Sequence, residues 1–180
     1  DRSPVSSACQ ENAPKSIGNG LTFPRSLSGR EEICSGIAML SDRVAVRLRR
    51  AGMKAAGVSL AIRDPDFRDI SRQRRLEPPT CLARELSQAA VSLAEGCWNM
   101  DSPVRALTVT ALYLISEDQA GVQLDLLGQA DAPRRDRLER LDRTLDQIRA
   151  KYGRNAISPA SSAGVCQGGV QEEDEEGATS

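Results

Sequence analysis

The chain has 180 residues, 24 basic and 25 acidic, with a formal net charge of −1 and no histidine. Catalytic triads that use histidine and most catalytic zinc sites are therefore excluded. The length predicts one modest domain with appendages, and no apolar run approaches the ~20 residues needed to cross a bilayer.

The five cysteines are scattered, odd in number and never spaced as C-x-x-C, at Cys9, Cys34, Cys81, Cys97 and Cys166. This pattern argues against a zinc site or a disulfide framework and predicts reduced thiols in the cytoplasm. The sequence shows no signal peptide, and its start at Asp1 predicts a piece of a longer protein.

Charge is unevenly distributed along the chain. Residues 43–75 hold ten Lys or Arg against three Asp, a net of +7, whereas the tail carries five acids in "EEDEEG". A basic block of this kind points to a polyanionic partner, although it is also compatible with a plain solvated surface.

The first elements follow from hydrophobic periodicity. Residues 1–14 are polar and aperiodic, which predicts a linker. Residues 16–23 alternate between apolar and small side chains, which predicts a half-buried strand ending at Pro24. Ser28 is the expected cap of an amphipathic helix that ends at Gly52. Its apolar stripe is Ile33, Ile37, Leu40, Val44 and Leu48.

A second set of elements repeats this order. Residues 54–63 and 67–76 are expected to form a hairpin through the turn "RDPD", although the second strand alternates imperfectly and a bulge could resolve this. "EPPT" is expected to break the chain, with Thr80 capping a second helix. That helix buries Leu82, Leu86, Ala90, Leu93 and Cys97, with Trp98 as a core anchor. Residues 104–115 form the last strand.

The order strand, helix, strand, strand, helix, strand predicts an α+β fold of the split βαβ type. Four antiparallel strands form one sheet, with two helices on one face. The other face stays open, and Ser16, Gly18 and Arg63 are expected to point from it.

The remaining residues fall into three parts. Residues 117–132 are linker-like, and residues 133–157 contain an amphipathic helix with Leu138, Leu141, Leu145, Ile148 and Tyr152 along one side. Three heptads are few for a coiled coil, so packing against its own domain or partial disorder is favoured. Residues 158–180 are expected to be a disordered acidic tail.

The strings "KSIGNGLTFPRSL", "GVSLAIRDPDFRDISRQRRLEPPT" and "PVRALTVTALYLI" together resemble the little finger domain of Y-family translesion DNA polymerases. The likeness is to the bacterial DNA polymerase IV group and covers roughly residues 14–128. It implies a little finger at residues 15–116, after the tail of a thumb.

The resemblance implies contacts with the phosphates of both DNA strands, without base reading. The DNA-binding residues expected from it and from the open face are Lys15, Ser16, Gly18, Thr22, Arg63, Arg72, Arg74, Arg75 and Arg105. Two departures stand out. Thr108, Val109 and Thr110 replace a frequent glycine-valine-arginine, and Arg75 stands where threonine is usual.

The segment "QLDLL" is similar to the pentapeptide with which bacterial polymerases dock on the sliding clamp. It comprises Gln123, Leu124, Asp125, Leu126 and Leu127. Gln123 would hydrogen-bond in the clamp groove while the leucines fill an apolar cleft.

The resemblance also implies a parent enzyme that adds nucleotides by two-metal phosphoryl transfer with Mg²⁺. The metal-binding carboxylates would belong to its palm, so this chain alone is expected to hold no cofactor, metal or catalytic residue. Two alternatives remain open. An RNA-binding split βαβ module predicts exposed aromatics on the sheet, and a protein-interaction adapter would work through residues 123–127 and the helix at 134–151.

Overall fold

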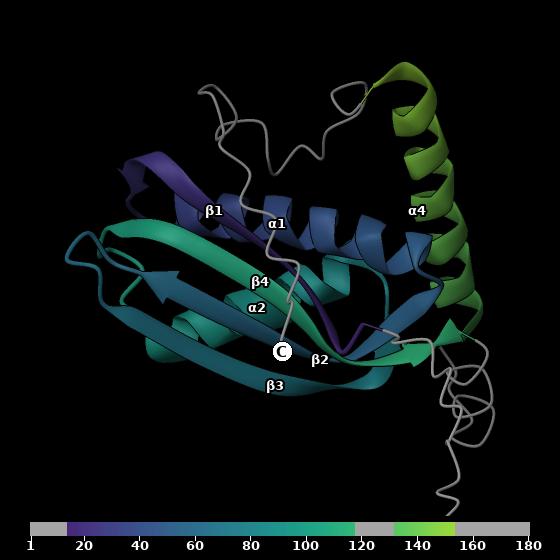
Figure 1. The fold of residues 1–180 in the computed structure, drawn as a ribbon, viewed down its shortest axis with the longest axis horizontal. Helices are drawn as coiled ribbons and strands as arrows, with labels where there is room; N and C mark the ends of the chain where they lie inside the picture. Colours follow the sequence, from purple (N-terminus) through teal and green to yellow (C-terminus); the bar gives the residue numbers. More distant parts are fainter. Residues whose placement is uncertain (1–13, 118–131, 154–180) are drawn as a thin grey trace, which may run out of the picture.

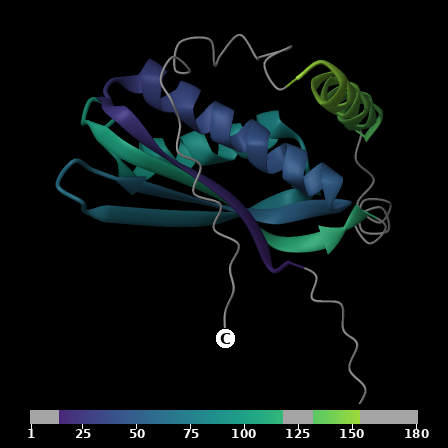
Figure 2. The ribbon, with the colours of Figure 1, turned by 45° about the horizontal axis from the view of Figure 1, so that its top comes forward.

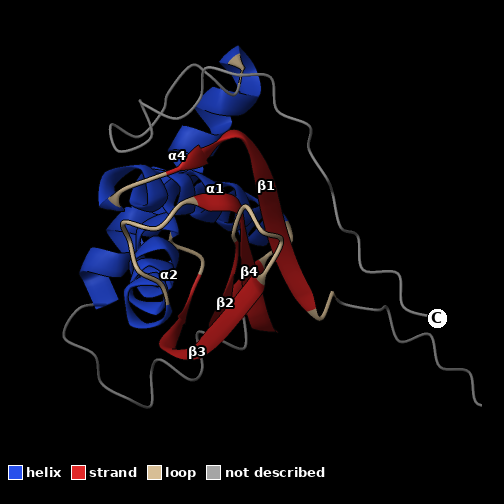
Figure 3. Cartoon of the chain, turned by 90° about the vertical axis from the view of Figure 1, so that its left-hand side faces the viewer, coloured by secondary structure: helices blue, strands red, loops and turns tan. Residues whose placement is uncertain are grey.

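The computed structural model describes residues 14–117 and 132–153. Four strands form one antiparallel sheet in the order β1-β4-β2-β3. Helices α1 and α2 lie on the same face of this sheet (Figures 1 and 3). The elements are β1 (Ser16–Leu27), α1 (Arg30–Arg50), β2 (Met53–Arg63), β3 (Asp69–Thr80), α2 (Ala83–Cys97), β4 (Val104–Ser116) and α4 (Ala132–Tyr152). The predicted α+β fold is confirmed.

The core lies between the sheet and the two helices. The predicted stripe of α1 is buried without exception, since Ile33, Ile37, Leu40, Val44 and Leu48 are each 0% exposed. Alternate residues of β2 and β4 belong to the same core cluster as this stripe. Figure 2 shows α1 lying across the strands that carry them. Burial of alternate side chains fixes which face of each strand meets the helices.

Strand β1 is longer than predicted, because Pro24 does not end it and it runs to Leu27. The register between β1 and β4 shifts between Thr22 and Leu27. Since β1 is an edge strand, a proline there removes no hydrogen bond that the sheet requires.

The predicted Ser28 cap is wrong. Gly29 occupies the N-cap of α1 with a φ of 87°, and no side chain caps the helix. Ser28 instead donates its backbone N–H to Glu32 Oε2 at 3.0 Å, so the helix entry is fixed by an acid of the first turn. The helix ends as predicted, with Gly52 at a φ of 63°.

The predicted break at "EPPT" is also wrong, because β3 continues through both prolines to Thr80. The register with β2 jumps there: Gly57 lies opposite Arg75, and Ala55 lies opposite Thr80. The other edge of β3 is free of strand partners among the described residues, which allows the prolines. Leu82, not Thr80, is the N-cap of α2. Thr80 Oγ1 still accepts the Leu82 N–H at 3.0 Å.

Helix α4 packs against its own domain at the end of α1 (Figures 1 and 2). The expected apolar stripe is only half right, since Leu141 is 54% exposed. The half-buried side of α4 is largely charged and forms ion pairs across the interface. These pairs are Arg49 with Asp142 and Asp146, Lys54 with Glu139, Arg135 with Glu85, Arg149 with Asp42 and Arg143 with Glu117.

The described cysteines carry free thiols, as predicted for Cys34, Cys81 and Cys97. Cys81 is fully buried, and this burial raises the pKa of its thiol to about 11. Trp98 packs against the core, and its indole N–H donates to the Ser102 carbonyl at 3.3 Å. No helix in the described ranges is long and apolar enough to span a membrane.

Candidate nucleic-acid interface

The strand register aligns four rows of side chains on the open face of the sheet. Residues directly opposite one another in antiparallel strands point to the same side. The rows, from β1 through β4 and β2 to β3, are Ser16-Leu112-Gly57-Arg75, Gly18-Thr110-Ser59-Gln73, Gly20-Thr108-Ala61-Ser71 and Thr22-Ala106-Arg63-Asp69. The predicted open face, with Ser16, Gly18 and Arg63 on it, is confirmed. Most of these side chains are small or carry a hydroxyl.

The two glycines of β1 have a reason within the sheet. A Cβ at Gly18 would lie 2.8 Å from Thr110 Oγ1, and one at Gly20 would lie 2.6 Å from Thr108 Oγ1. The threonine side chains of β4 lean over β1 at both positions. Local packing therefore accounts for the glycines, independently of any ligand.

The cations of this face lie at its two ends. Lys15 is exposed just before Ser16. At the other end Arg63 donates twice to Asp69, from Nε at 2.7 Å and Nη2 at 3.0 Å. This hydrogen bonding lowers the pKa of the Asp69 carboxyl, so the pair is close to neutral as a unit.

Arg72 and Arg74 lie on the opposite side of β3 from the open face. They are opposite Leu60 and Val58, whose side chains are buried toward the helices. Arg74 Nη1 lies 3.4 Å from Ser92 Oγ of α2. The jump in register comes after these residues and leaves their side unchanged. The predicted cations of β3 are thus divided, with Arg75 on the open face and the other two along the rim.

Arg105 is engaged with the protein backbone. Its Nη1 donates to the Phe23 carbonyl at 2.7 Å and the Pro24 carbonyl at 3.1 Å. It holds β1 at the point where the register with β4 shifts. Its predicted DNA contact would have to use its remaining N–H groups.

Tyr113 was missed by sequence reasoning. Strict alternation places residue 113 on the helix side of β4, but it has a φ of 53° and the residue is 47% exposed. The ring lies over Gly57 and beside Arg75. The available signal was a polar aromatic residue in the inward-facing parity of "ALYLI".

The clamp-binding prediction for residues 123–127 lies outside the described residues. Within the described ranges, no three His, Cys, Asp or Glu side chains form a group that could hold a metal ion. The prediction that the chain holds no metal stays a prediction.

Residues 14–126 match the model of the impB/mucB/samB family C-terminal domain. The chain belongs to this family, which confirms the resemblance to a polymerase little finger. A protein named DNA polymerase IV from Acetivibrio thermocellus is 36% identical over 153 residues, 85% of this chain and 38% of that protein. DNA polymerase IV of Pelotomaculum thermopropionicum is 35% identical over 162 residues, 90% of this chain and 38% of that protein. The chain thus spans well under half the length of these relatives.

Two solved structures show a weaker likeness. A complex of the beta-clamp processivity factor and the little finger domain of PolIV gives a TM-score of 0.46 at 15% identity, covering 54% of this chain and 86% of that chain. A post-insertion binary complex of Dbh DNA polymerase gives 0.49 at 13% identity, covering 56% and 29%. Both scores are too low to carry an argument, so the family assignment depends on the sequence.

Proposed function

We propose that this chain is the DNA-binding part of an error-prone translesion DNA polymerase, where it holds the primer–template by its phosphate backbones and tethers the enzyme to the sliding clamp. The observation that carries the proposal is the open face of the sheet, which no described helix covers and which small and hydroxyl-bearing side chains line.

Such a face suits a backbone rather than base edges. Hydroxyl groups of Ser16, Ser59 and Thr110 donate hydrogen bonds to phosphate oxygens, and cations near the face supply counter-charge. Lys15 and Arg75 serve one end of the face, while Arg72 and Arg74 reach a strand that passes the rim of β3. Contacts of this kind position a duplex of any sequence, as a lesion-bypass enzyme requires.

The other parts of the proposal rest on sequence. Residues 123–127 bind the clamp groove, residues 1–14 connect to a thumb, and the parent enzyme works in the cytoplasm with Mg²⁺ held by carboxylates outside this chain. The 180-residue chain alone is then inactive, and a primer-extension assay with Mg²⁺ should give no product.

The test of DNA binding is a salt titration with a fluorescent blunt duplex. Affinity should fall with salt with a logarithmic slope of about −0.9 for each phosphate neutralised. Changing Arg72 and Arg74 together to Gln should reduce the slope. The matched control changes Arg134 and Arg137 to Gln on exposed positions of α4. No binding by the unaltered chain at low salt would refute the proposal.

The clamp contact of the proposed function and the RNA-binding alternative need separate measurements. Changing Gln123 and Leu126 to Ala should abolish co-elution with the sliding clamp, and unchanged co-elution would mean that the motif is not used. Exposed Tyr113 is the kind of aromatic that the RNA-binding alternative requires. Tighter binding of a single-stranded RNA than of a single-stranded DNA of the same sequence would favour that alternative.

A further inference from the structure

Tyr113 is turned onto the open face at a cost in backbone conformation. Its φ of 53° lies in the left-handed region, which non-glycine residues seldom adopt. The neighbouring residues of the same parity, Val109 and Ala111, are fully buried toward the helices. Tyr113 instead leaves 47% of its surface exposed on the side that carries the small residues.

Gly57 of β2 provides the space for this ring. A Cβ at Gly57 would lie 2.7 Å from Tyr113 Cδ2 and 3.1 Å from Cε2. These distances are too short for any other residue unless the ring moves. The glycine therefore lets the tyrosine ring lie close against the sheet, on a face whose other side chains are mostly small.

Arg75 of β3 is the third residue of this group, after Tyr113 of β4 and Gly57 of β2. It lies opposite Gly57 in the register, and its Cζ is 4.9 Å from the centroid of the Tyr113 ring. Arg75 is an exposed residue of the edge strand β3. Lys15 lies near the same end, because it immediately precedes Ser16, the first residue of β1, and Ser16 pairs with Leu112.

We propose that Arg75 and Tyr113 form a stacking site for one unpaired base of single-stranded DNA, with the exposed Lys15 ammonium placed to meet an adjacent phosphate. Planar guanidinium and aromatic groups stack on nucleobases without regard to sequence. The inference rests on the proposed function for its DNA partner and extends it from the duplex to the unpaired strand beside it.

An unpaired base fits this site better than a base pair does. Inside a duplex both faces of each base are covered by neighbouring pairs, so away from the duplex ends only an unpaired nucleotide can offer its face to a side chain. Arg75 stands at one end of the open face, in the row that also holds Ser16, Leu112 and Gly57, and the Tyr113 ring lies over Gly57 of that row. A duplex on the three remaining rows would place its single-stranded extension at this pair.

The test compares three DNA probes with the 180-residue chain: a blunt duplex, the same duplex with a single-stranded extension, and the extension strand alone. The extended duplex should bind about five- to tenfold more tightly than the blunt one. 2-Aminopurine scanned along the extension should be quenched at one position. Tyr113→Leu should remove both effects and leave blunt-duplex affinity unchanged.

Two further variants separate stacking from charge and from folding. Tyr113→Phe keeps the ring and should retain the quenching, whereas Arg75→Lys keeps the charge but loses the planar group and should weaken it. Arg75 is exposed on an edge strand, so this variant tests the site even where Tyr113→Leu fails to fold. Equal quenching in the unaltered chain, Tyr113→Leu and Arg75→Lys would overturn the inference.

Failure of the two proposals can be told apart. Absence of blunt-duplex binding by the unaltered chain refutes the proposed function, while quenching of the isolated strand that depends on Tyr113 would still support the stacking site. Duplex binding that gains nothing from any extension refutes the stacking site alone.

Discussion

Helix α1 takes part in two interfaces of opposite chemistry. On one side its apolar stripe packs on the sheet, and Leu40 is 0% exposed. On another side Asp42 and Arg49 make ion pairs with α4. Apolar burial contributes roughly 25 cal/mol per Å² and is not weakened by ionic screening. Ion pairs gain little net free energy once the loss of hydration is counted, and salt weakens those near the surface.

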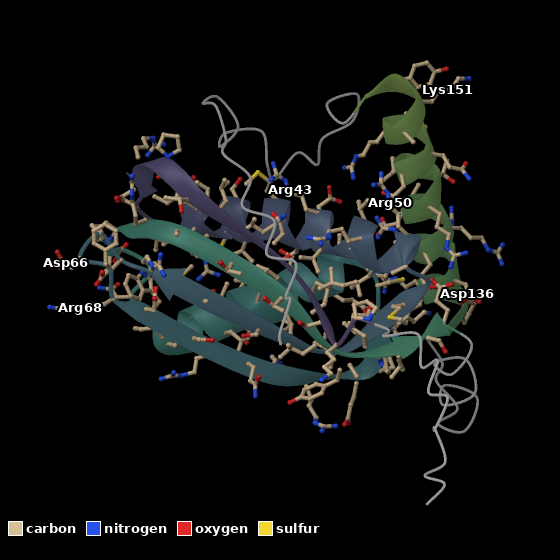
Figure 4. All side chains as sticks on the ribbon, viewed as in Figure 1. Arg43, Arg50, Asp66, Arg68, Asp136 and Lys151 are labelled. Carbon is tan, nitrogen blue, oxygen red and sulfur yellow. The ribbon has the colours of Figure 1, made fainter. Side chains whose placement is uncertain are left out.

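Apolar burial therefore holds the sheet to α1 and α2, whereas ion pairs hold α4 to the rest of the domain. The sheet and its two helices should remain folded under conditions that release α4. Figure 4 shows Asp136 and Lys151 near opposite ends of α4, and Arg43 and Arg50 on α1. In the same view Asp66 and Arg68 lie in the turn between β2 and β3, at the opposite end of the domain. The charged side chains of α4 thus lie far from the β2–β3 turn, and the two ends of the domain can be perturbed separately.

The largest effect is expected in the apolar interface. Leu40→Ala should lower the free energy of unfolding by about 2–5 kcal/mol, because a fully buried side chain leaves a cavity. Urea denaturation followed by circular dichroism measures this. The matched control is Leu141→Ala on α4, where the side chain is 54% exposed and the change should stay within about 0.5 kcal/mol. Equal losses would mean that α4 belongs to the core.

Breaking the charged interface should release α4 and leave the rest intact. Arg49 is only 4% exposed and donates to Asp142, Asp146 and the Cys81 carbonyl. Arg49→Ala should cost about 1–3 kcal/mol, since it removes a charged donor that two carboxylates and a buried carbonyl share. Hydrogen exchange should accelerate in residues 132–152 and not in residues 33–48.

The control for this prediction is a pair at the protein surface. Arg25 pairs with Glu32, and its side chain is 69% exposed. Arg25→Ala should change stability much less than Arg49→Ala does, because solvent screens this pair, and it should not change exchange in α4. Added salt should speed exchange in α4 of the unaltered chain, as Arg49→Ala does. Salt-independent exchange in α4 would contradict the electrostatic account of this interface.

A smaller effect should follow from filling the glycine positions of β1. Gly20→Ala should cost about 0.5–1.5 kcal/mol, because its Cβ would meet Thr108 Oγ1 at 2.6 Å. Thr108→Ala should recover most of this loss in the double variant, measured as a coupling free energy. No recovery would mean that the glycine is needed for a reason other than the threonine beside it.

The apolar interface was predictable because burial of one face makes apolar residues recur at a regular spacing in the sequence. The stripe of α1 and the alternation of β2 gave the helix, the strand and the face of each. The extension of β3 through Pro78 and Pro79 was not predictable in this way, because it depends on β3 being an edge strand. An edge position is a property of the assembled sheet.

The candidate site and the α4 interface could not be predicted in full from the sequence, for the same reason. The sides of Arg72 and Arg75 became known only from pairing with β2, and Tyr113 left its expected side through one backbone angle. In α4 the leucine spacing suggested an apolar face, but the pairing of Glu139 and Asp146 required their partners on β2 and α1. Charged partners distant in sequence leave no periodic signal.

The smallest effect should come from an acid within the charged interface. Burial raises the pKa of Asp142 above its ordinary value of 3.8, although Arg49 lies beside it. The folded chain therefore holds this proton more tightly than the unfolded chain does. The resulting contribution to stability is present below pH 3.8 and is lost as the pH rises through the folded pKa. Asp142→Asn should therefore leave stability at pH 7 unchanged or slightly higher.

The contribution of Glu32 to stability should change with pH in the opposite direction, which makes Glu32 the matched control. Hydrogen bonds from Arg25 and from the Ser28 N–H lower the pKa of its carboxyl to about 2. Its contribution to stability is present above the ordinary value of 4.5 and is lost as the pH falls toward 2. Glu32→Gln should thus destabilise the chain at pH 7 and converge with the unaltered chain in acid, whereas Asp142→Asn should diverge upward as the pH rises. Thermal unfolding of both variants from pH 2 to 7 measures the two slopes. Slopes of the same sign would show that Asp142 is held as a surface acid, and the α4 interface would then resemble the Arg25–Glu32 pair.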